Sequence, residues 1–129
     1  MGVQIGIIQG RVTTRQESFD KLEPLSVPAM SASKTINVGT KSGELTRILV
    51  RRTAGTSGGN FTVQVFDAAD LNLDSMLFEA TSEGQDRMDM IRSELGRFNS
   101  STSELYVRVS TVSAGHSFQI RLQGNKTRI

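Results

Sequence analysis

Residues 47–66 read RILVRRTAGTSGGNFTVQVF, and this stretch decides the fold class. Apolar residues alternate with polar ones on both sides of a glycine-rich loop, as Ile48 and Val50 before it and as Phe61, Val63 and Val65 after it. Such alternation is typical of strands that have one face in a core. The stretch therefore predicts a β-hairpin whose arginines point away from the core.

The same period of two continues beyond this stretch. Ile36 and Val38 alternate, and alternation recurs on both sides of the turn SAGHS, in Leu105, Val107, Val109, Phe118, Ile120 and Leu122. Most of these residues are β-branched or aromatic, which suits a pleated and half-buried surface. We expect an all-β domain, an antiparallel two-sheet sandwich of Greek-key or jelly-roll type.

The two ends of the chain differ from this body. Residues 1–33 contain both prolines and drift toward serine and alanine, which favours an extended N-terminal arm. Within the arm, Val3, Ile5 and Ile7 alternate as a short strand would, and such a strand adds either to its own sheet or to a neighbour's sheet edge. The predicted sandwich spans residues 34–123, and residues 124–129 form a short C-terminal tail.

The period changes between the two alternating regions. Residues 76–81, MLFEAT, read as one more strand. In the next segment Met88, Ile91, Leu95 and Phe98 have helical spacing, and Gly96 provides a stop signal. We expect one short helix or an irregular crossover here.

Composition limits the class of protein. At 129 residues the chain fits one domain, and 36% hydrophobic with 22% charged residues indicates a soluble globular protein. A formal charge of +2 is too small for a typical nucleic-acid binder. No apolar run approaches a membrane span and the first residues lack a signal peptide, so we expect a protein that is made and used inside a cell.

Residues for catalysis or metal binding are scarce. Cysteine is absent, and the single histidine, His116, lies in a turn with no nucleophile signature beside it. Asp70, Asn72 and Asp74 match the first half of a calcium loop, but the required glycine and the closing acid are missing. We expect neither an enzyme nor a bound cofactor or metal.

The outward faces of the predicted strands carry the remaining signal. Opposite the core positions lie Arg47, Leu49, Arg51, Tyr106, Arg108 and Arg121. Arginine and tyrosine are enriched in protein interfaces, although a solvated face with cross-strand acid pairs explains them equally well. Aromatic residues make up 5% of the chain and tryptophan is absent, which disfavours sugar platforms and single-stranded nucleic acid.

The order of these segments resembles a known family. The sequence GELTRILVRRTAGTSGGNFTVQVFD, followed by MLFEAT and then SELYVRVSTVSAGHSFQIRLQ, is similar to β-sandwich head decoration (cement) proteins of tailed phages and related appendage domains. The resemblance covers about residues 43–123 and implies a virion protein, assembled in the host cytoplasm, that binds the major capsid protein, often as a trimer. A carbohydrate-binding or appendage module of a tail or head fibre is the alternative.

This resemblance assigns an interface role to the outward residues. The expected apolar anchors are Val3, Ile5 and Ile7 of the arm. The expected partners of acidic capsid residues are Arg47, Arg51, Arg108 and Arg121, with Leu49 and Tyr106 beside them. Neither a membrane nor a nucleic acid is expected as a partner.

Overall fold

The computed structural model describes residues 17–91 and 96–127. Within these ranges the chain forms nine strands: β1 (Glu17–Val27), β2 (Ser31–Asn37), β3 (Ser42–Ala54), β4 (Phe61–Phe66), β5 (Met76–Ser82), β6 (Arg87–Ile91), β7 (Arg97–Asn99), β8 (Glu104–Thr111) and β9 (His116–Lys126). A 3-10 helix, η2 (Leu73–Ser75), precedes β5. None of the helices in these ranges has the length and apolarity to cross a membrane.

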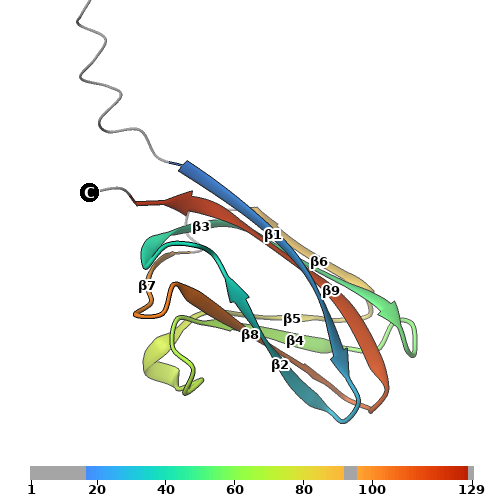
Figure 1. Cartoon of the computed structure of the whole chain (residues 1–129). Helices are drawn as coiled ribbons and strands as arrows, with labels where there is room; N and C mark the ends of the chain where they lie inside the picture. Colours follow the sequence, from blue (N-terminus) through green and yellow to red (C-terminus); the bar gives the residue numbers. More distant parts are fainter. Residues whose placement is uncertain (1–16, 92–95, 128–129) are drawn as a thin grey trace, which may run out of the picture.

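Two antiparallel sheets face each other (Figure 1). Sheet A has the order β1-β9-β3-β6, with β7 also paired to β3, and sheet B has the order β2-β8-β4-β5. Adjacent strands in the sheets are mostly distant in the sequence, which is the strand order of a jelly roll. The predicted all-β, two-sheet class is therefore confirmed.

The pairing is nested about the connection at residues 67–75. β4 pairs with β5 next to this connection, β3 pairs with β6 and β7 further out, β2 pairs with β8, and β1 pairs with β9 at the two ends. The chain thus resembles one long hairpin rolled up so that successive strand pairs alternate between the sheets. β3 and β9 then pair within sheet A, and β4 and β8 pair within sheet B.

The predicted hairpin at residues 47–66 is wrong. β3 belongs to sheet A and β4 to sheet B, so the glycine-rich loop at 55–60 crosses from one sheet to the other. The turn before His116 joins β8 to β9 across the sheets in the same way. Alternation identifies strands and their inner faces, but it carries no information on which strands share a sheet.

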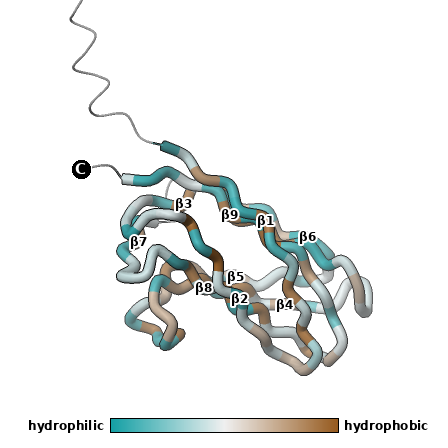
Figure 2. Tube along the Cα trace, in the orientation of Figure 1, coloured by the Kyte–Doolittle hydropathy of each residue, from teal (hydrophilic) through white to brown (hydrophobic). Residues whose placement is uncertain are grey.

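The predicted core is confirmed. Every alternating apolar residue predicted between Ile36 and Leu122 is at most 1% exposed, and hydrophobic and hydrophilic residues alternate along the chain in Figure 2. A β-bulge between Leu45 and Arg47 shifts the phase of β3, so that Leu45 is buried along with Ile48 and Val50. A second bulge, between Arg52 and Ala54, interrupts the alternation at the end of β3.

The boundaries of the arm and of the tail require correction. β1 pairs with β9 over its whole length and buries Phe19, Leu25 and Val27, so residues 17–33 are part of the sandwich and not of a separate arm. β9 continues to Lys126, so residues 124–126 of the predicted tail are strand. Residues 1–16, including Val3, Ile5 and Ile7, lie outside the described residues.

Of the two alternatives predicted after β5, a short helix or an irregular crossover, the helix is wrong for the residues that the structure describes there; Leu95 lies outside them. Met88 is buried in β6 and Phe98 in β7, and both strands pair with β3. Ile91 is 64% exposed, so it does not share a buried helical face with Met88. β6 has two inward residues, Met88 and Met90, and β7 has one, which leaves too few alternating positions for either to be recognised as a strand. The strand predicted at 76–81 is confirmed as β5.

Two glycines are required where aromatic rings pack on sheet A. The rings of Phe19 and Phe98 meet edge to face, with centroids 6.1 Å apart. A Cβ atom on Gly124 would lie 2.3 Å from the Glu44 carbonyl oxygen and 2.6 Å from the Phe19 ring, and one on Gly43 would lie 2.2 Å from the Asn125 carbonyl oxygen. No side chain fits in this space without moving the backbone.

We expect Gly124→Ala to lower the free energy of unfolding by roughly 1–3 kcal/mol, because the new methyl group overpacks the ring against the strand. Thermal and urea unfolding measure the loss. Gly59→Ala is the matched control, since a Cβ there meets its nearest atom at 3.6 Å, an ordinary contact. Equal stability of the two variants would contradict the close packing described for Gly124.

Candidate protein interface

The outer side of sheet A carries an ordered grid of charged and apolar side chains, which we call the arginine face. It consists of the outward residues at the centre of four adjacent strands: Asp20, Leu22 and Pro24 of β1; Gln119, Arg121 and Gln123 of β9; Arg47, Leu49 and Arg51 of β3; and Arg87, Asp89 and Ile91 of β6. The backbone register aligns them in rows, one of which is Leu22, Arg121, Leu49 and Asp89.

Asp20 holds Arg121 in a fixed orientation. The guanidinium donates from Nε to Oδ1 at 2.9 Å and from Nη2 to Oδ2 at 2.7 Å, and the Gln123 amide donates to Oδ2 at 3.0 Å. The hydrogen bonds from Arg121 and Gln123 lower the pKa of the Asp20 carboxyl to about 2, and the one from Arg121 has the larger effect. The same contact raises the pKa of Arg121, so both groups are charged at neutral pH.

Asp89 does the same for Arg47 at the other side of the face. Arg47 donates from Nε and from Nη2 to the two carboxylate oxygens, both at 2.9 Å, and Arg87 adds a third donor at 3.1 Å. The hydrogen bond from Arg47 lowers the pKa of Asp89, and it raises the pKa of Arg47 in return. Two-point contacts of this kind fix the plane of a guanidinium.

These ion pairs set the shape of the face more than the stability of the fold. All of them are partly open to water, which screens exposed pairs and leaves them little net stabilising effect. The jelly roll depends instead on its buried side chains, each of which contributes about 1.5–3 kcal/mol. What the pairs provide is a set of side chains that have few alternative conformations.

Apolar side chains lie between the paired charges. Leu22 is 53% exposed and Ile91 is 64% exposed, although both project from regular strands. Four of the predicted interface residues, Arg47, Leu49, Arg51 and Arg121, therefore lie together on one surface with uncovered leucine and isoleucine. Mixed arginine and apolar area is typical of protein interfaces.

Tyr106 and Arg108 lie elsewhere. Both belong to β8 and face away from the core on the opposite sheet. Tyr106 is 8% exposed, and its hydroxyl donates to Glu104 Oε1 at 3.2 Å, so the expected exposed tyrosine is wrong. Arg108 donates to Gln64 Oε1 at 2.9 Å and lies 5.2 Å from the centre of the Phe66 ring. The structure thus separates the predicted site residues between two surfaces.

The outer face of sheet B has a different chemistry. One row across it consists of Thr81, Thr62, Ser110 and Ser31, and the hydroxyls of Thr62 and Thr81 lie 2.9 Å apart. The adjacent row carries Glu79 and Gln64, which are hydrogen-bonded at 2.7 Å. Arg108 continues this row beyond Gln64, but no large apolar side chain among the described residues is exposed beside it on this face, whereas sheet A combines arginines with exposed Leu22 and Ile91.

Arg52 is a structural residue that the sequence reasoning missed because it is charged, although it follows Ile48 and Val50 in the inward phase of β3. It projects inward at the end of the core, with its guanidinium 5.3 Å from the Phe61 ring centre and 5.5 Å from that of Phe118. It pairs with Asp86 and donates to the Gly59 carbonyl. Asp86 also accepts from the Gly58 N–H at 2.8 Å and the Ser57 hydroxyl at 2.6 Å, which together lower its pKa.

Asp20 and Leu22 are among the residues of the arginine face that sequence reasoning missed. Both lie in the segment that was assigned to the arm, where two prolines obscured an alternation of apolar Phe19, Leu25 and Val27. This alternation was the available signal for a strand. It would have placed Asp20 and Leu22 on an outward face.

His116 is buried and not placed for catalysis. It begins β9, which lies between β1 and β3, so it is not on an edge strand, and it is 2% exposed. Its Nε2 lies 3.0 Å from the Ser113 hydroxyl, and its Nδ1 has no hydrogen-bond partner in the structure. A Cβ on Gly55 would approach Nδ1 to 2.5 Å, so the loop backbone closes over the ring. A substrate has no access to this imidazole.

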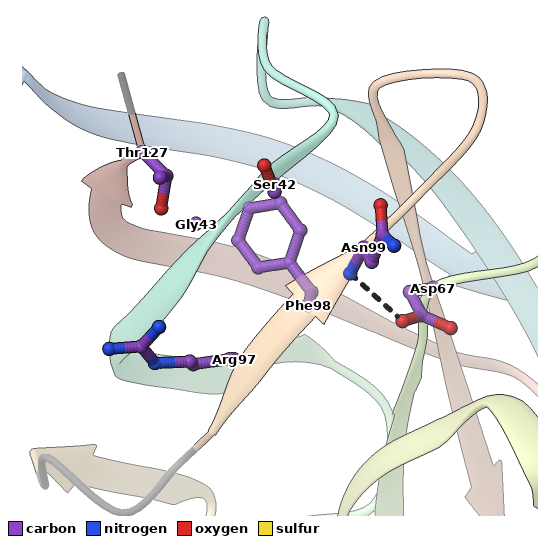
Figure 3. A pocket seen from close by; sticks show the side chains of 7 residues that line it. All are labelled: Ser42, Gly43, Asp67, Arg97, Phe98, Asn99 and Thr127. Atoms are coloured by element: carbon purple, nitrogen blue, oxygen red, sulfur yellow. Dashed lines mark hydrogen bonds between the residues drawn. The ribbon is translucent and has the colours of Figure 1, made fainter. Parts of the chain in front are cut away.

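A pocket of about 610 Å³ lies where β3, β7 and β9 meet (Figure 3). Its lining includes Asp67 and Asn99, which are joined by a hydrogen bond of 3.2 Å from the Asn99 N–H to the carboxylate. Arg97 also lines the pocket, and Figure 3 shows its guanidinium directed away from Asp67. The lining contains no nucleophile paired with a base, and Phe98 is only 3% exposed, which leaves no aromatic platform for a sugar.

The half calcium loop has a structural role. Asp70 Oδ1 accepts hydrogen bonds from the Asn72 N–H and from the Ser75 hydroxyl, each at 3.1 Å, and so shapes the turn that precedes η2. Over residues 17–91 and 96–127, no group of three or more histidine, cysteine, aspartate or glutamate side chains is arranged to hold a metal ion.

Comparisons with known proteins bear on the fold. No protein-family model and no curated protein matches the chain. Similar solved structures include a protein of Bacillus endospore appendages, which form disulfide-linked pili (TM-score 0.52, 10% identity, covering 91% of this chain and 94% of that chain). They also include tomato aspermy virus (0.45, 10%, 88% and 78%) and the capsid of Helicobacter pylori bacteriophage KHP30 (0.41, 10%, 82% and 92%).

These likenesses concern the fold alone, because the identity is 10% in each case. The match to the pilus protein agrees with the β-sandwich architecture over most of both chains. Its disulfide linkage has no counterpart here, since this chain contains no cysteine.

The Asp20–Arg121 pair leads to a prediction about pH. We expect Arg121→Gln to raise the pKa of Asp20 from about 2 toward its ordinary value of 3.8, measured by NMR titration of the carboxyl carbon. Because folding lowers this pKa, the pair stabilises the wild type above pH 3.8, and the effect is lost as the pH falls through about 2. Arg87→Gln is the control and should leave Asp20 unchanged. An unaltered pKa in Arg121→Gln would disprove the contact.

Proposed function

We propose that this chain is a non-enzymatic structural protein of a phage particle that binds and stabilises the capsid lattice through its arginine face. The observation that carries the proposal is the contrast between the two outer faces. Sheet A presents oriented guanidinium groups beside exposed Leu22 and Ile91, whereas sheet B presents mainly hydroxyl and amide groups, with Arg108 bound to Gln64. A protein that attaches by one side needs such an asymmetry.

Charge favours an acidic partner surface. The arginine face has four guanidinium groups, from Arg47, Arg51, Arg87 and Arg121, and two carboxylates, from Asp20 and Asp89, so two positive charges are in excess. Acidic residues of the major capsid protein would balance them. Modest contacts suffice on a symmetric shell, because a trimer that engages several capsid subunits gains affinity through avidity.

The features that argue against catalysis support the same proposal. The only histidine is buried, and the pocket between β3, β7 and β9 lacks a paired nucleophile and base. Location in the virion and assembly in the host cytoplasm follow from the proposed role. A carbohydrate-binding or appendage module remains the alternative, and binding to a glycan array but not to particles would favour it.

The proposal is tested by adding the purified protein to particles that lack it and counting bound copies by quantitative mass spectrometry. We expect a copy number that scales with the capsid lattice. Fewer than a few tens of copies per particle would reject a shell-wide role.

Attachment of a polymer identifies the docking side. The chain has no cysteine, so Leu22→Cys and Thr35→Cys each create a single site for maleimide-polyethylene glycol, on the outer faces of sheet A and sheet B respectively. We expect the polymer at position 22 to prevent binding and the polymer at position 35 to leave it unchanged. The opposite result would place the interface on sheet B.

The anchor role of Val3, Ile5 and Ile7 stays a prediction and is tested by truncation. Removing residues 1–16 retains all the described strands, whereas removing residues 1–33 would also delete β1 and uncover β9. We expect the chain without residues 1–16 to unfold at the temperature of the full chain but to lose most of its binding to particles. Undiminished binding would show that these anchors are dispensable.

A further inference from the structure

A small pocket lies within the arginine face. It has a volume of about 270 Å³ and is lined by Leu22, Leu49, Arg51, Gln119 and Arg121. The register places Arg121 between the two leucines in one row, and Gln119 beside Arg51 in the next. This volume is below the roughly 300–1,000 Å³ of sites for small molecules, and it suits a single side chain.

The two arginines of the pocket differ in their partners. Both carboxylate oxygens of Asp20 accept hydrogen bonds from Arg121, which is thereby held in place. Within residues 17–91 and 96–127, the side chain of Arg51 donates only to the Gln119 amide oxygen, at 3.2 Å. Among the described residues of the arginine face, Arg51 is the arginine without a carboxylate partner.

The neighbours of Arg51 increase the local positive charge. Arg51 lies directly opposite Arg87 in the register of β3 and β6, and like charges at opposite positions repel. Asp89, which pairs with Arg87, already accepts two hydrogen bonds from Arg47. An added carboxylate next to Arg51 would relieve this repulsion and could accept two parallel hydrogen bonds from the guanidinium.

We propose that this pocket binds a glutamate side chain of the partner protein, with its methylene groups on Leu22 and Leu49 and its carboxylate on Arg51. The apolar walls favour a side chain that has an aliphatic stem over a phosphate, which has none. The assignment rests on the proposed function, since the partner is the acidic surface that the arginine face contacts.

The test compares Arg51→Gln with Arg87→Gln in equilibrium binding to particles that lack the protein. Both variants remove one positive charge from the same face, but only Arg51 lines the pocket. We expect Arg51→Gln to raise the Kd about tenfold or more, as loss of a central interface arginine does, and Arg87→Gln to change it less than about threefold. Arg51→Lys should give an intermediate Kd, because an ammonium group lacks the two-point geometry.

The outcomes separate this inference from the function on which it rests. Equal Kd values for Arg51→Gln and Arg87→Gln, with binding by the wild type, would overturn the glutamate pocket and leave the docking role intact. Failure of the wild type to bind any particle would overturn both. Arg51 is exposed, so thermal unfolding should confirm that each variant is as stable as the wild type.

Discussion

Each strand of this domain has one apolar face, and that face is removed from water only by contact with the opposite sheet. The nested pairing satisfies this constraint, because the chain passes from one sheet to the other after most strands and places inward side chains opposite one another. The central pairs β3–β9 and β4–β8 form from strands that are far apart in sequence. The fold therefore depends on long-range contacts, and local turns contribute little to its topology.

The outer faces of the two sheets need not be buried against another sheet. Their side chains can therefore differ between sheet A and sheet B. Any side chain that tolerates water is compatible with the outer side of a strand, so the paired arginines and exposed leucine of sheet A are not required by the core. Exposed apolar residues on a regular strand have an energetic cost in an isolated domain, and they are common where a partner covers them. The exposed Leu22 and Ile91 beside paired arginines therefore support the proposed docking role.

The ends of the sandwich show how polar groups close the core. Arg52 covers two phenylalanine rings, and its guanidinium connects the loop at 55–60 to Asp86. At the other end, Phe19 and Phe98 pack on strands that glycine leaves open. In both places residue polarity is misleading, because the charged Arg52 holds the inward position that follows Ile48 and Val50, and a glycine stands at an inward position where an apolar side chain is expected.

The sequence by itself determined the class of fold, the core and the outward direction of Arg47, Leu49, Arg51 and Arg121, because a strand repeats every two residues and each inward position shows its polarity. Only the tertiary structure decided which strands share a sheet, that β1 belongs to the sandwich, and that Tyr106 and Arg108 lie on the other face. The tertiary structure also decided the partners of Arg47 and Arg121, because Asp89 and Asp20 are distant from them in the chain. Strand pairing is a contact between distant residues, and the alternation along one strand does not identify the strand that pairs with it.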